Sequence, residues 1–306
     1  MIGSGSEGVP ADWKPLKVHL IGMGKMGLPM GCHLAAAGLE VTADDVNEAR
    51  RAAASASGMT VVRGEDGIAS AQVIISSLPN DDALLQVAQT VRRQAQAGAL
   101  YVDTSTVSPA CSAEVAAMLD ERQLPYLRAA VSGNSSMAEA AQLTLLVSGP
   151  KAAYERLLPM LRLWGPHQFW LGEAEQARSM KLVVNLMIAQ TSAMLAEALA
   201  LGTKGGLRWA DMWQVLTRSA VASPILKAKS AQLARRDFTP TFTVLQMAKD
   251  IKLILDEAER LKVALPQTAI TLQMLHAAAA NGDADADYAA MIGCAERAAG
   301  IQPGRD

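Results

Sequence analysis

The sequence predicts an α/β fold in which a doubly wound sheet is followed by an all-α C-terminal domain, with a long helix linking the two. Three observations lead to this prediction. Short apolar segments alternate with helical segments up to about residue 173. A glycine-rich turn follows the first apolar segment. Beyond that point the segments have helical periodicity to the end of the chain.

The glycine-rich turn lies in the stretch HLIGMGKMGLPMG, directly after the apolar segment KVHLIG. Gly22, Gly24 and Gly27 have the G-x-G-x-x-G spacing. Glycine tolerates positive φ and allows a close approach of backbone atoms. Between a strand and a helix, this spacing suits a pyrophosphate held by backbone N–H groups at the helix N-terminus. The alternative is a glycine-rich turn that binds no ligand, and the segments that follow distinguish it from a pyrophosphate-binding loop.

Those segments favour a Rossmann-type domain. MGLPMGCHLAAAG predicts a helix with Pro29 in its first turn and Gly38 at its end. LEVTADD then alternates like a strand that ends in Asp44 and Asp45. A carboxylate about 20 residues past the glycines accepts a hydrogen bond from the adenosine ribose. We assign this role to Asp45, because it closes the strand and the next helix begins after it; Asp44 then lies at a solvated strand end.

The same carboxylate bears on the choice of cofactor. Its charge repels a 2′-phosphate, so we predict NAD as the cofactor. Arg50 and Arg51 lie close by in the sequence, which keeps NADP possible.

The alternation continues through five further strands, and this sets the predicted domain limits. Residues 17–173 form the dinucleotide-binding domain and residues 174–300 an all-helical domain for substrate binding and dimerisation. Residues 1–16 are rich in Gly, Ser and Pro without the apolar core of a signal peptide, and we expect a flexible tail. A helix of about 30 residues begins near residue 173 and links the domains. The further strands are AQVIISSLP, GALYVDTS, LPYLRAAVSG, LTLLVSG and HQFWLG.

Composition excludes several classes of partner. The chain has 306 residues and a net charge of −2, which favours neither nucleic acid nor an anionic membrane. Its three cysteines are far apart, which argues against a disulfide framework and fits the cytoplasm. The four histidines lack the spacing of metal ligands, so no metal is expected. The apolar stretch KLVVNLMIAQTSAMLAEALALG is interrupted by Asn185, Gln190 and Glu197, and indicates a buried helix rather than a membrane span.

Lys181 and Asn185 are the candidate catalytic pair. They are four residues apart on the predicted long helix and share one face. A lysine beside a cofactor cleft can donate a proton to a substrate carbonyl, and an amide one turn away can orient it. The alternative is a lysine whose alkyl chain covers apolar neighbours while its ammonium reaches water.

Four motifs, in order, resemble those of the β-hydroxyacid dehydrogenases, the family of 3-hydroxyisobutyrate dehydrogenase and tartronate semialdehyde reductase. They are the loop GMGKMGLPMG, the segments DTSTVSP and AAVSGN…AEAAQLTLLVSG, the pair in KLVVN, and FTPTFTVLQMAKDIKL. The resemblance covers residues 17 to about 295. It implies an NAD-dependent oxidoreductase that interconverts a small β-hydroxy acid and its semialdehyde or keto form, and a homodimer or tetramer.

The resemblance also implies a role for each matching residue. Lys181 is the general acid and base, with Asn185 beside it. Both also contact substrate, as do Asp250 and the carboxylate-binding residues Ser132, Gly133 and Asn134. The cofactor is bound by Gly22, Met23, Gly24, Lys25, Met26, Gly27, Asp45, Leu78, Pro79, Thr106 and Lys249.

Three departures from the family pattern concern the substrate. Arg128 begins the stretch RAAVSGN, where the family usually has Asp-Ala-Pro before its Val-Ser-Gly-Gly. Asn134 replaces a glycine, and Ala141 stands where glycine is usual. Two alternative functions remain. An imine reductase shares this architecture but usually has another residue at the position of Lys181. A non-catalytic dinucleotide-binding protein would have lost the lysine, which this chain retains.

Overall fold

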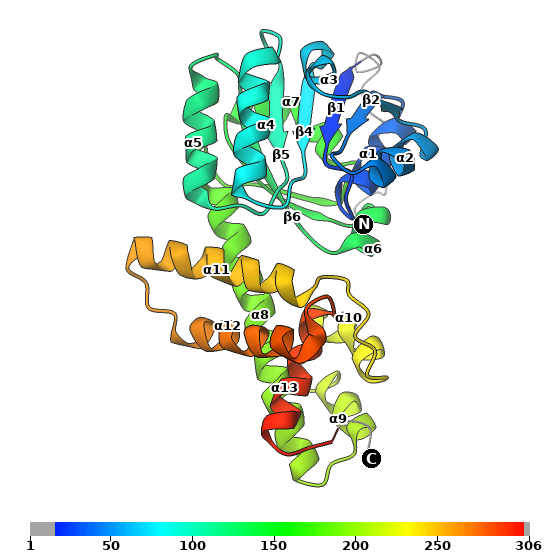
Figure 1. Ribbon diagram of the computed structural model, residues 1–306, viewed down its shortest axis with the longest axis vertical. Coiled ribbons are helices and arrows are strands. Elements are labelled where there is room, and N and C mark those ends of the chain that lie inside the picture. Colours follow the sequence, from blue (N-terminus) through cyan, green and yellow to red (C-terminus); the bar gives the residue numbers. More distant parts are fainter. Residues whose placement is uncertain (1–15, 303–306) are drawn as a thin grey trace, which may run out of the picture. The chain divides into compact units, whose positions relative to one another are not determined.

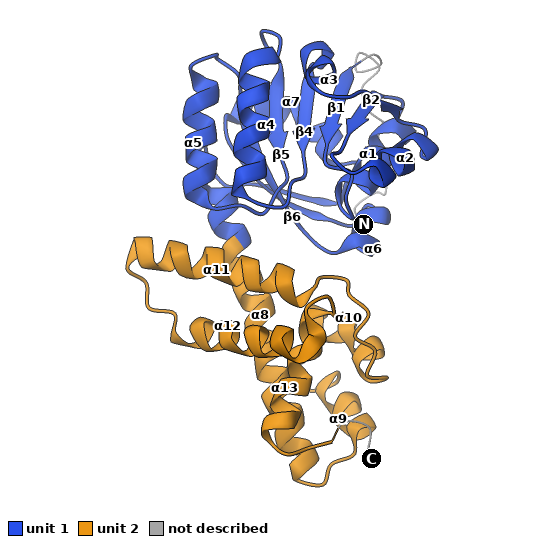
Figure 2. Ribbon diagram, in the orientation of Figure 1, with its two compact units in different colours: residues 1–181 blue, residues 182–306 orange. Residues whose placement is uncertain are grey.

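The computed structural model describes residues 16–302 (Figure 1). The predicted tail lies outside the described residues except for Leu16. The chain divides into two compact units, with the boundary between Lys181 and Leu182 (Figure 2).

The first unit contains an eight-stranded mixed sheet in the order β3-β2-β1-β4-β5-β6-β7-β8. The first six strands have the Rossmann order and run parallel, which confirms the predicted fold class. The strands are β1 (Lys17–Ile21), β2 (Glu40–Asp44), β3 (Thr60–Val61), β4 (Val73–Ser76), β5 (Leu100–Asp103), β6 (Tyr126–Ser132), β7 (Thr144–Ser148) and β8 (His167–Trp170).

Two features of this sheet were absent from the sequence prediction. β3 has only two residues, too few to give a periodic signal. β7 runs antiparallel to β6, because helix α6 (Ser135–Glu139) has five residues and cannot carry the chain back along the sheet for a parallel crossover. α7 (Lys151–Leu161) is long enough, so β8 lies parallel to β7.

Helices cover both faces of the sheet and bury it on both sides. α1 (Gly27–Ala36), α2 (Glu48–Ala56) and α7 pack over one face through an apolar cluster that includes Met30, Leu34 and Leu157. α3 (Glu65–Ser70), α4 (Asp81–Gln94) and α5 (Pro109–Asp120) pack over the other (Figure 1). Every residue of β4 and β5 is buried, as expected of central parallel strands. Pro29 lies in the first turn of α1 and Gly38 follows its end with φ +86°, as predicted.

The second unit is helical. It contains most of α8 (Gln176–Lys204), which has 29 residues and matches the predicted long helix. The remaining helices are α9 (Trp209–Leu216), α10 (Pro224–Leu233), α11 (Val244–Leu261), α12 (Pro266–Ala278) and α13 (Met291–Ala298). Their core includes Ala189, Ala196 and Leu199 of α8.

α8 is the one helix in residues 16–302 that is long and apolar enough to cross a membrane, and 44% of its apolar window is buried. Two of its polar residues form hydrogen bonds within the helical unit. Gln190 donates to Thr268 at 3.1 Å, and Asn185 donates to Asp250. Bonded amides inside the apolar stretch, one of them buried, favour the interpretation of α8 as a helix of a folded domain.

Ala141 has φ +52°, a left-handed conformation that costs a residue with a Cβ about 1–2 kcal/mol. It follows α6, whose C-cap is Ala140, so it occupies the C′ position where glycine is favoured. We predict that Ala141→Gly raises the free energy of unfolding by about 0.5–1 kcal/mol, after the added flexibility of the unfolded chain is subtracted. Urea denaturation measures this change.

Ala140→Gly is the matched control, because Ala140 has φ −85° and gains nothing from glycine. It should lower the free energy of unfolding. A stability loss in Ala141→Gly as large as in the control would contradict the strain argument.

Candidate functional site

Glycine is required for different structural reasons at two of the three positions after β1, and the third position is open. Gly22 has φ +94°, and a Cβ there would lie 2.3 Å from the Ser77 carbonyl oxygen. A Cβ on Gly27 would lie 1.9 Å from the Gly22 carbonyl oxygen, so α1 requires glycine to pack this closely. Gly24 has no such neighbour; the nearest atom, on Arg50, is 3.9 Å away. The backbone at Gly24 is therefore open to a ligand, which fits a bound pyrophosphate.

Asp45 connects the end of β2 to the glycine loop. Its side chain is almost completely buried, and Oδ2 accepts a hydrogen bond from the backbone N–H of Met23 at 2.7 Å. Oδ1 accepts from Asn47 N–H at 2.8 Å. Asp44 instead accepts from Gly64 N–H at 3.1 Å. Of the two predicted candidates, Asp45 is thus the carboxylate bonded to the glycine loop.

A cation lies close to this carboxylate. The Arg50 guanidinium, which is more than half exposed, is 3.6 Å from Asp45 Oδ2. Arg51 donates a hydrogen bond to the Asp45 carbonyl oxygen. Arg50 can therefore turn toward solvent or toward a phosphate, whereas Arg51 is engaged with the backbone.

A cavity of about 280 Å³ adjoins the end of β2 and is lined by residues of β1, α3 and α4. Its lining includes Asp45, Val46, Val87 and His19. Burial lowers the pKa of His19 to about 4 although Asp44 acts in the opposite direction, so the imidazole is neutral. Val46 and Val87 give this cavity an apolar wall beside Asp45, which suits an aromatic ring such as adenine. Val46 was not predicted from the sequence, although its position directly after Asp45 was a usable signal.

The loops after β4 and β5 contain three predicted cofactor residues. Leu78 N–H donates to Ser105 Oγ at 2.8 Å, so the two loops are bonded to each other. Thr106 follows Ser105 and is half-buried, while Pro79 is exposed. Parallel strands bring their carboxyl ends to one edge, and the glycine loop lies at the same edge.

The predicted carboxylate-binding residues lie at the end of β6. Gly133 has φ +143°, and a Cβ there would lie 2.7 Å from the Leu143 side chain. Asn134 caps α6: its Oδ1 accepts from Met137 N–H at 3.0 Å and from Ser136 Oγ at 2.8 Å. Its carbonyl oxygen is thus used within the loop, and only its amide N–H groups are left to donate to a ligand.

The predicted catalytic pair lies on α8. Lys181 is half-buried, and Asn185 is 4% exposed. Within the helical unit, Asn185 Nδ2 donates to Asp250 Oδ2 at 2.5 Å, and Lys249 Nζ lies 2.7 Å from Asp250 Oδ1. Asp250 therefore fixes the amide of Asn185 and pairs with Lys249. The structure thus brings together three residues that the sequence analysis placed on two separate segments.

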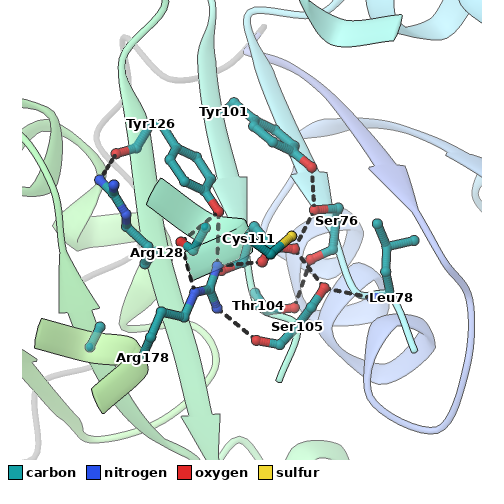
Figure 3. A network of polar contacts seen from close by, with 12 residues as sticks. Ser76, Leu78, Tyr101, Thr104, Ser105, Cys111, Tyr126, Arg128 and Arg178 are labelled. Carbon is teal, nitrogen blue, oxygen red and sulfur yellow. Dashed lines mark hydrogen bonds and ion pairs between the residues drawn. The ribbon is translucent and has the colours of Figure 1, made fainter. Parts of the chain in front are cut away.

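One buried element of the site was missed by sequence reasoning. Arg178, one turn before Lys181, forms an ion pair with Asp103 at the end of β5 (Figure 3). Both residues were visible in the sequence, Arg178 as the single arginine in an apolar helix and Asp103 in the segment YVDTS. Nothing in the sequence paired them, because 75 residues separate them.

Known proteins share both the sequence and the fold. Residues 17–172 match the family described as the NAD-binding domain of 6-phosphogluconate dehydrogenase. Residues 176–295 match the NAD-binding domain of NADP-dependent 3-hydroxyisobutyrate dehydrogenase. The 2-(hydroxymethyl)glutarate dehydrogenase of Eubacterium barkeri is 32% identical over 94% of this chain and 97% of its own length. The 2-hydroxy-3-oxopropionate reductase of Escherichia coli is 26% identical over 90% of this chain and 96% of its own length.

A solved structure agrees with these relatives. The 3-hydroxyisobutyrate dehydrogenase of Mycobacterium tuberculosis with L-serine superposes with a TM-score of 0.84 at 27% identity, over 90% of this chain and 98% of that one. An imine reductase from Pseudomonas shares the fold at 20% identity with a TM-score of 0.62, over 90% and 98% of the two chains.

The glycine loop, the carboxylate at the end of β2 and these relatives define an NAD(P)-dependent oxidoreductase. The chain belongs to the β-hydroxyacid dehydrogenase family. The resemblance in its four motifs is thereby confirmed, as are the enzyme class and the cofactor class.

Proposed function

We propose that this enzyme interconverts a small β-hydroxy acid and its semialdehyde or keto form, with NAD as the preferred cofactor and Lys181 as the general acid and base. The observation that supports it best is the arrangement on α8. Lys181 and Asn185 share a helix face, and Asn185 is held by Asp250 in a buried hydrogen bond. A buried amide with one fixed orientation is suited to aligning a neighbouring lysine or hydroxyl group.

The cofactor supplies the hydride acceptor for oxidation and the hydride donor for reduction. Lys181 removes the hydroxyl proton during oxidation and returns it to the carbonyl oxygen during reduction, where its charge also stabilises the developing oxyanion. Asn185 orients the ammonium of Lys181 or the reacting oxygen. Ser132, Gly133 and the amide of Asn134 bind the substrate carboxylate, while Lys249 contacts the cofactor and Asp250 holds Asn185.

The relatives support this substrate class. Their names specify 2-(hydroxymethyl)glutarate, 2-hydroxy-3-oxopropionate, 3-hydroxyisobutyrate and L-threonate. All four are short carboxylic acids with an oxidisable or reducible carbon close to the carboxylate. A spectrophotometric screen of these four compounds with NAD(H) and NADP(H) tests the class directly. Turnover of cyclic imines with no turnover of any of these acids would favour the imine reductases, and cofactor binding without any turnover would favour a binding protein.

We also propose a homodimer formed through α8. Five exposed apolar residues recur along one face of this helix at heptad-like spacing: Met180, Val183, Met187, Met194 and Leu201. A stripe of this kind on a long helix suits packing against a second copy of itself.

The dimer is checked by molar mass in solution. Met187→Lys with Met194→Lys should convert it to a monomer, because two charges would be buried without partners. Val263→Lys, at an exposed valine away from the stripe, is the control and should leave the molar mass unchanged. Equal molar masses for all three proteins would contradict this interface.

We also propose a cytoplasmic location. All three cysteines are free, which suits a reducing compartment. Fractionation of the native host would test it, and recovery in a secreted fraction would contradict it.

The cofactor preference depends on Asp45. Removing its charge should relieve repulsion of a 2′-phosphate near Arg50, so we predict that Asp45→Ala lowers the ratio of kcat/KM for NAD to that for NADP by about tenfold or more, which corresponds to about 1.4 kcal/mol. Steady-state kinetics with both cofactors measure the ratio.

Asp44→Ala is the matched control, because the Asp44 carboxylate accepts from Gly64 N–H and forms no hydrogen bond to the glycine loop. Asp44 Oδ1 also accepts from Asp45 N–H at 2.9 Å, but the substitution leaves the Asp45 carboxylate in place. The ratio should therefore stay within about twofold of the native value. A larger shift in Asp44→Ala than in Asp45→Ala would assign the ribose to the other carboxylate. A native preference for NADP would contradict the assignment of NAD.

The proton-transfer role is tested at Lys181. Lys181→Ala should lower kcat by about 10² to 10⁴. Cofactor affinity should survive, because the glycine loop is untouched. Lys181→Arg should not restore turnover, since a guanidinium hardly releases its proton. Near-normal kcat in Lys181→Ala would show that Lys181 is a lysine covering apolar surface and that the proton donor lies elsewhere.

A further inference from the structure

The first turn of α8 is held by a fully buried guanidinium. Arg178 is 1% exposed and forms an ion pair with Asp103, which is 0% exposed. The same guanidinium donates to the carbonyl oxygen of Ser105 at 2.6 Å, to Ser112 Oγ at 3.2 Å and to the Tyr126 hydroxyl at 3.0 Å. These groups come from β5, β6, α5 and the loop after β5, and Figure 3 shows Arg178 between Tyr126 and Ser105.

The Asp103 carboxylate extends the network to β4. It accepts hydrogen bonds from Ser76 Oγ and from Ser105 Oγ, both at 2.6 Å. Ser105 Oγ in turn accepts from Leu78 N–H. One buried carboxylate thus joins the loops after β4 and β5 to the start of α8, and these loops carry the proposed cofactor contacts Leu78 and Thr106.

The protonation states of this network favour a permanent ion pair. Burial by itself lowers the pKa of Arg178, but Tyr126 and Asp103 outweigh it, and the pKa is raised. Burial raises the pKa of Tyr126 to about 12, so its hydroxyl stays neutral. The guanidinium therefore keeps its charge and its planar set of donors throughout the working range of the enzyme.

A second ion pair holds the start of α8, with the positive charge on the sheet and the negative charge beside the helix. Arg128 of β6 pairs with Glu175, the residue before α8, and its guanidinium lies 4.6 Å from the Tyr126 ring centroid. Ser148 Oγ donates to the Ala174 carbonyl oxygen at 2.6 Å. Arg128 is one of the departures from the family pattern, and here it takes part in anchoring α8.

An apolar contact would be sufficient if α8 only had to be attached to the sheet. Burying an ion pair is costly in free energy, and apolar pairs of similar volume are often equally stable. What the guanidinium adds is a fixed orientation, because its donors reach a carboxylate, a carbonyl and two hydroxyls at once. Three residues of helix, a rise of about 4.5 Å, separate it from Lys181. Thr106 follows directly after the carbonyl that Arg178 binds.

We propose that Arg178 is a positioning residue that sets the orientation of Lys181 through the first turn of α8. This inference rests on the proposed role of Lys181 as proton donor. A displacement of about 1 Å at a reacting group can reduce the rate about 10²-fold, so loosening this turn lowers turnover without removing any group that touches substrate.

The test is a double-mutant cycle of Arg178→Lys with Lys181→Ala. Arg178→Lys keeps the charge beside Asp103 but loses the planar set of donors. It should lower kcat at least about tenfold, on whichever of the four screened acids gives the highest kcat/KM, with little change in cofactor affinity. In the Lys181→Ala background it should lower kcat by less than about twofold, because its effect passes through Lys181. An equal factor in both backgrounds would overturn the proposal.

Tyr126→Phe is the matched control. It removes one hydroxyl from the same network but leaves the contacts of Arg178 to Asp103 and Ser105, so kcat should stay within about twofold of the native value. Asp103→Asn is a second route if Arg178→Lys does not fold. It keeps the shape of the side chain and weakens the same ion pair. Its effect on kcat should also disappear in the Lys181→Ala background.

Hydrogen exchange gives a readout that does not depend on turnover. In Arg178→Lys, amides of residues 104–107 and 177–185 should exchange faster, while those of α11 should be unchanged. Unchanged exchange in both segments would overturn the proposal even if no substrate were found. Suppose that Lys181→Ala keeps normal turnover while the two segments exchange faster in Arg178→Lys. Lys181 is then not the proton donor, and Arg178 has no positioning role toward it. If Lys181→Ala is inactive and Arg178→Lys is normal, only the positioning inference fails.

Discussion

The parallel alignment of β1, β2, β4 and β5 is the constraint on which the cofactor half of the site depends. Parallel strands end at one edge of the sheet, so four loops that are distant in sequence meet there. Gly22, Asp45 and Leu78 follow three of these strands. Contact at this edge is close: Gly22 N–H donates to the Asp44 carbonyl oxygen at 2.9 Å, and Ser77 N–H donates to the Ile21 carbonyl oxygen at 2.9 Å.

Close contact at this edge also explains why small residues and buried carboxylates occur together. Glycine at positions 22 and 27 lets β1, α1 and the loop after β4 touch through backbone atoms. The N–H groups exposed by such a turn need acceptors, and Asp45 supplies one to Met23. Asp103 does the same for hydroxyls at the ends of β4 and β5. Each carboxylate therefore organises a loop before any cofactor is bound.

Function in this family combines groups with different structural demands. The cofactor loops need backbone geometry, which glycine and buried carboxylates provide. The proton transfer proposed for Lys181 needs a side chain whose position is fixed although its tip is not completely buried. In the proposed mechanism, hydrogen bonds and ion pairs on neighbouring residues fix this position: those of Arg178 and Glu175 at the start of α8, and that of Asp250 with Asn185 one turn beyond Lys181.

Local sequence patterns determined most of the fold and the choice of candidate residues. The G-x-G-x-x-G spacing, the apolar strand before it and the acid after β2 define a dinucleotide-binding unit, because each is set by neighbours within about 30 residues. The length of α8 and the shared face of Lys181 and Asn185 follow from helical periodicity alone. Whether those residues perform the proposed chemistry remains a prediction.

Other features depended on contacts between distant segments, which no local pattern encodes. The antiparallel direction of β7 follows from how short α6 is, and the role of Asn134 as the cap of α6 follows from where that helix begins. The pairing of Arg178 with Asp103, and of Asp250 with both Asn185 and Lys249, required the folded chain. A buried charge specifies that it needs a partner, and only the tertiary structure decides which one it meets.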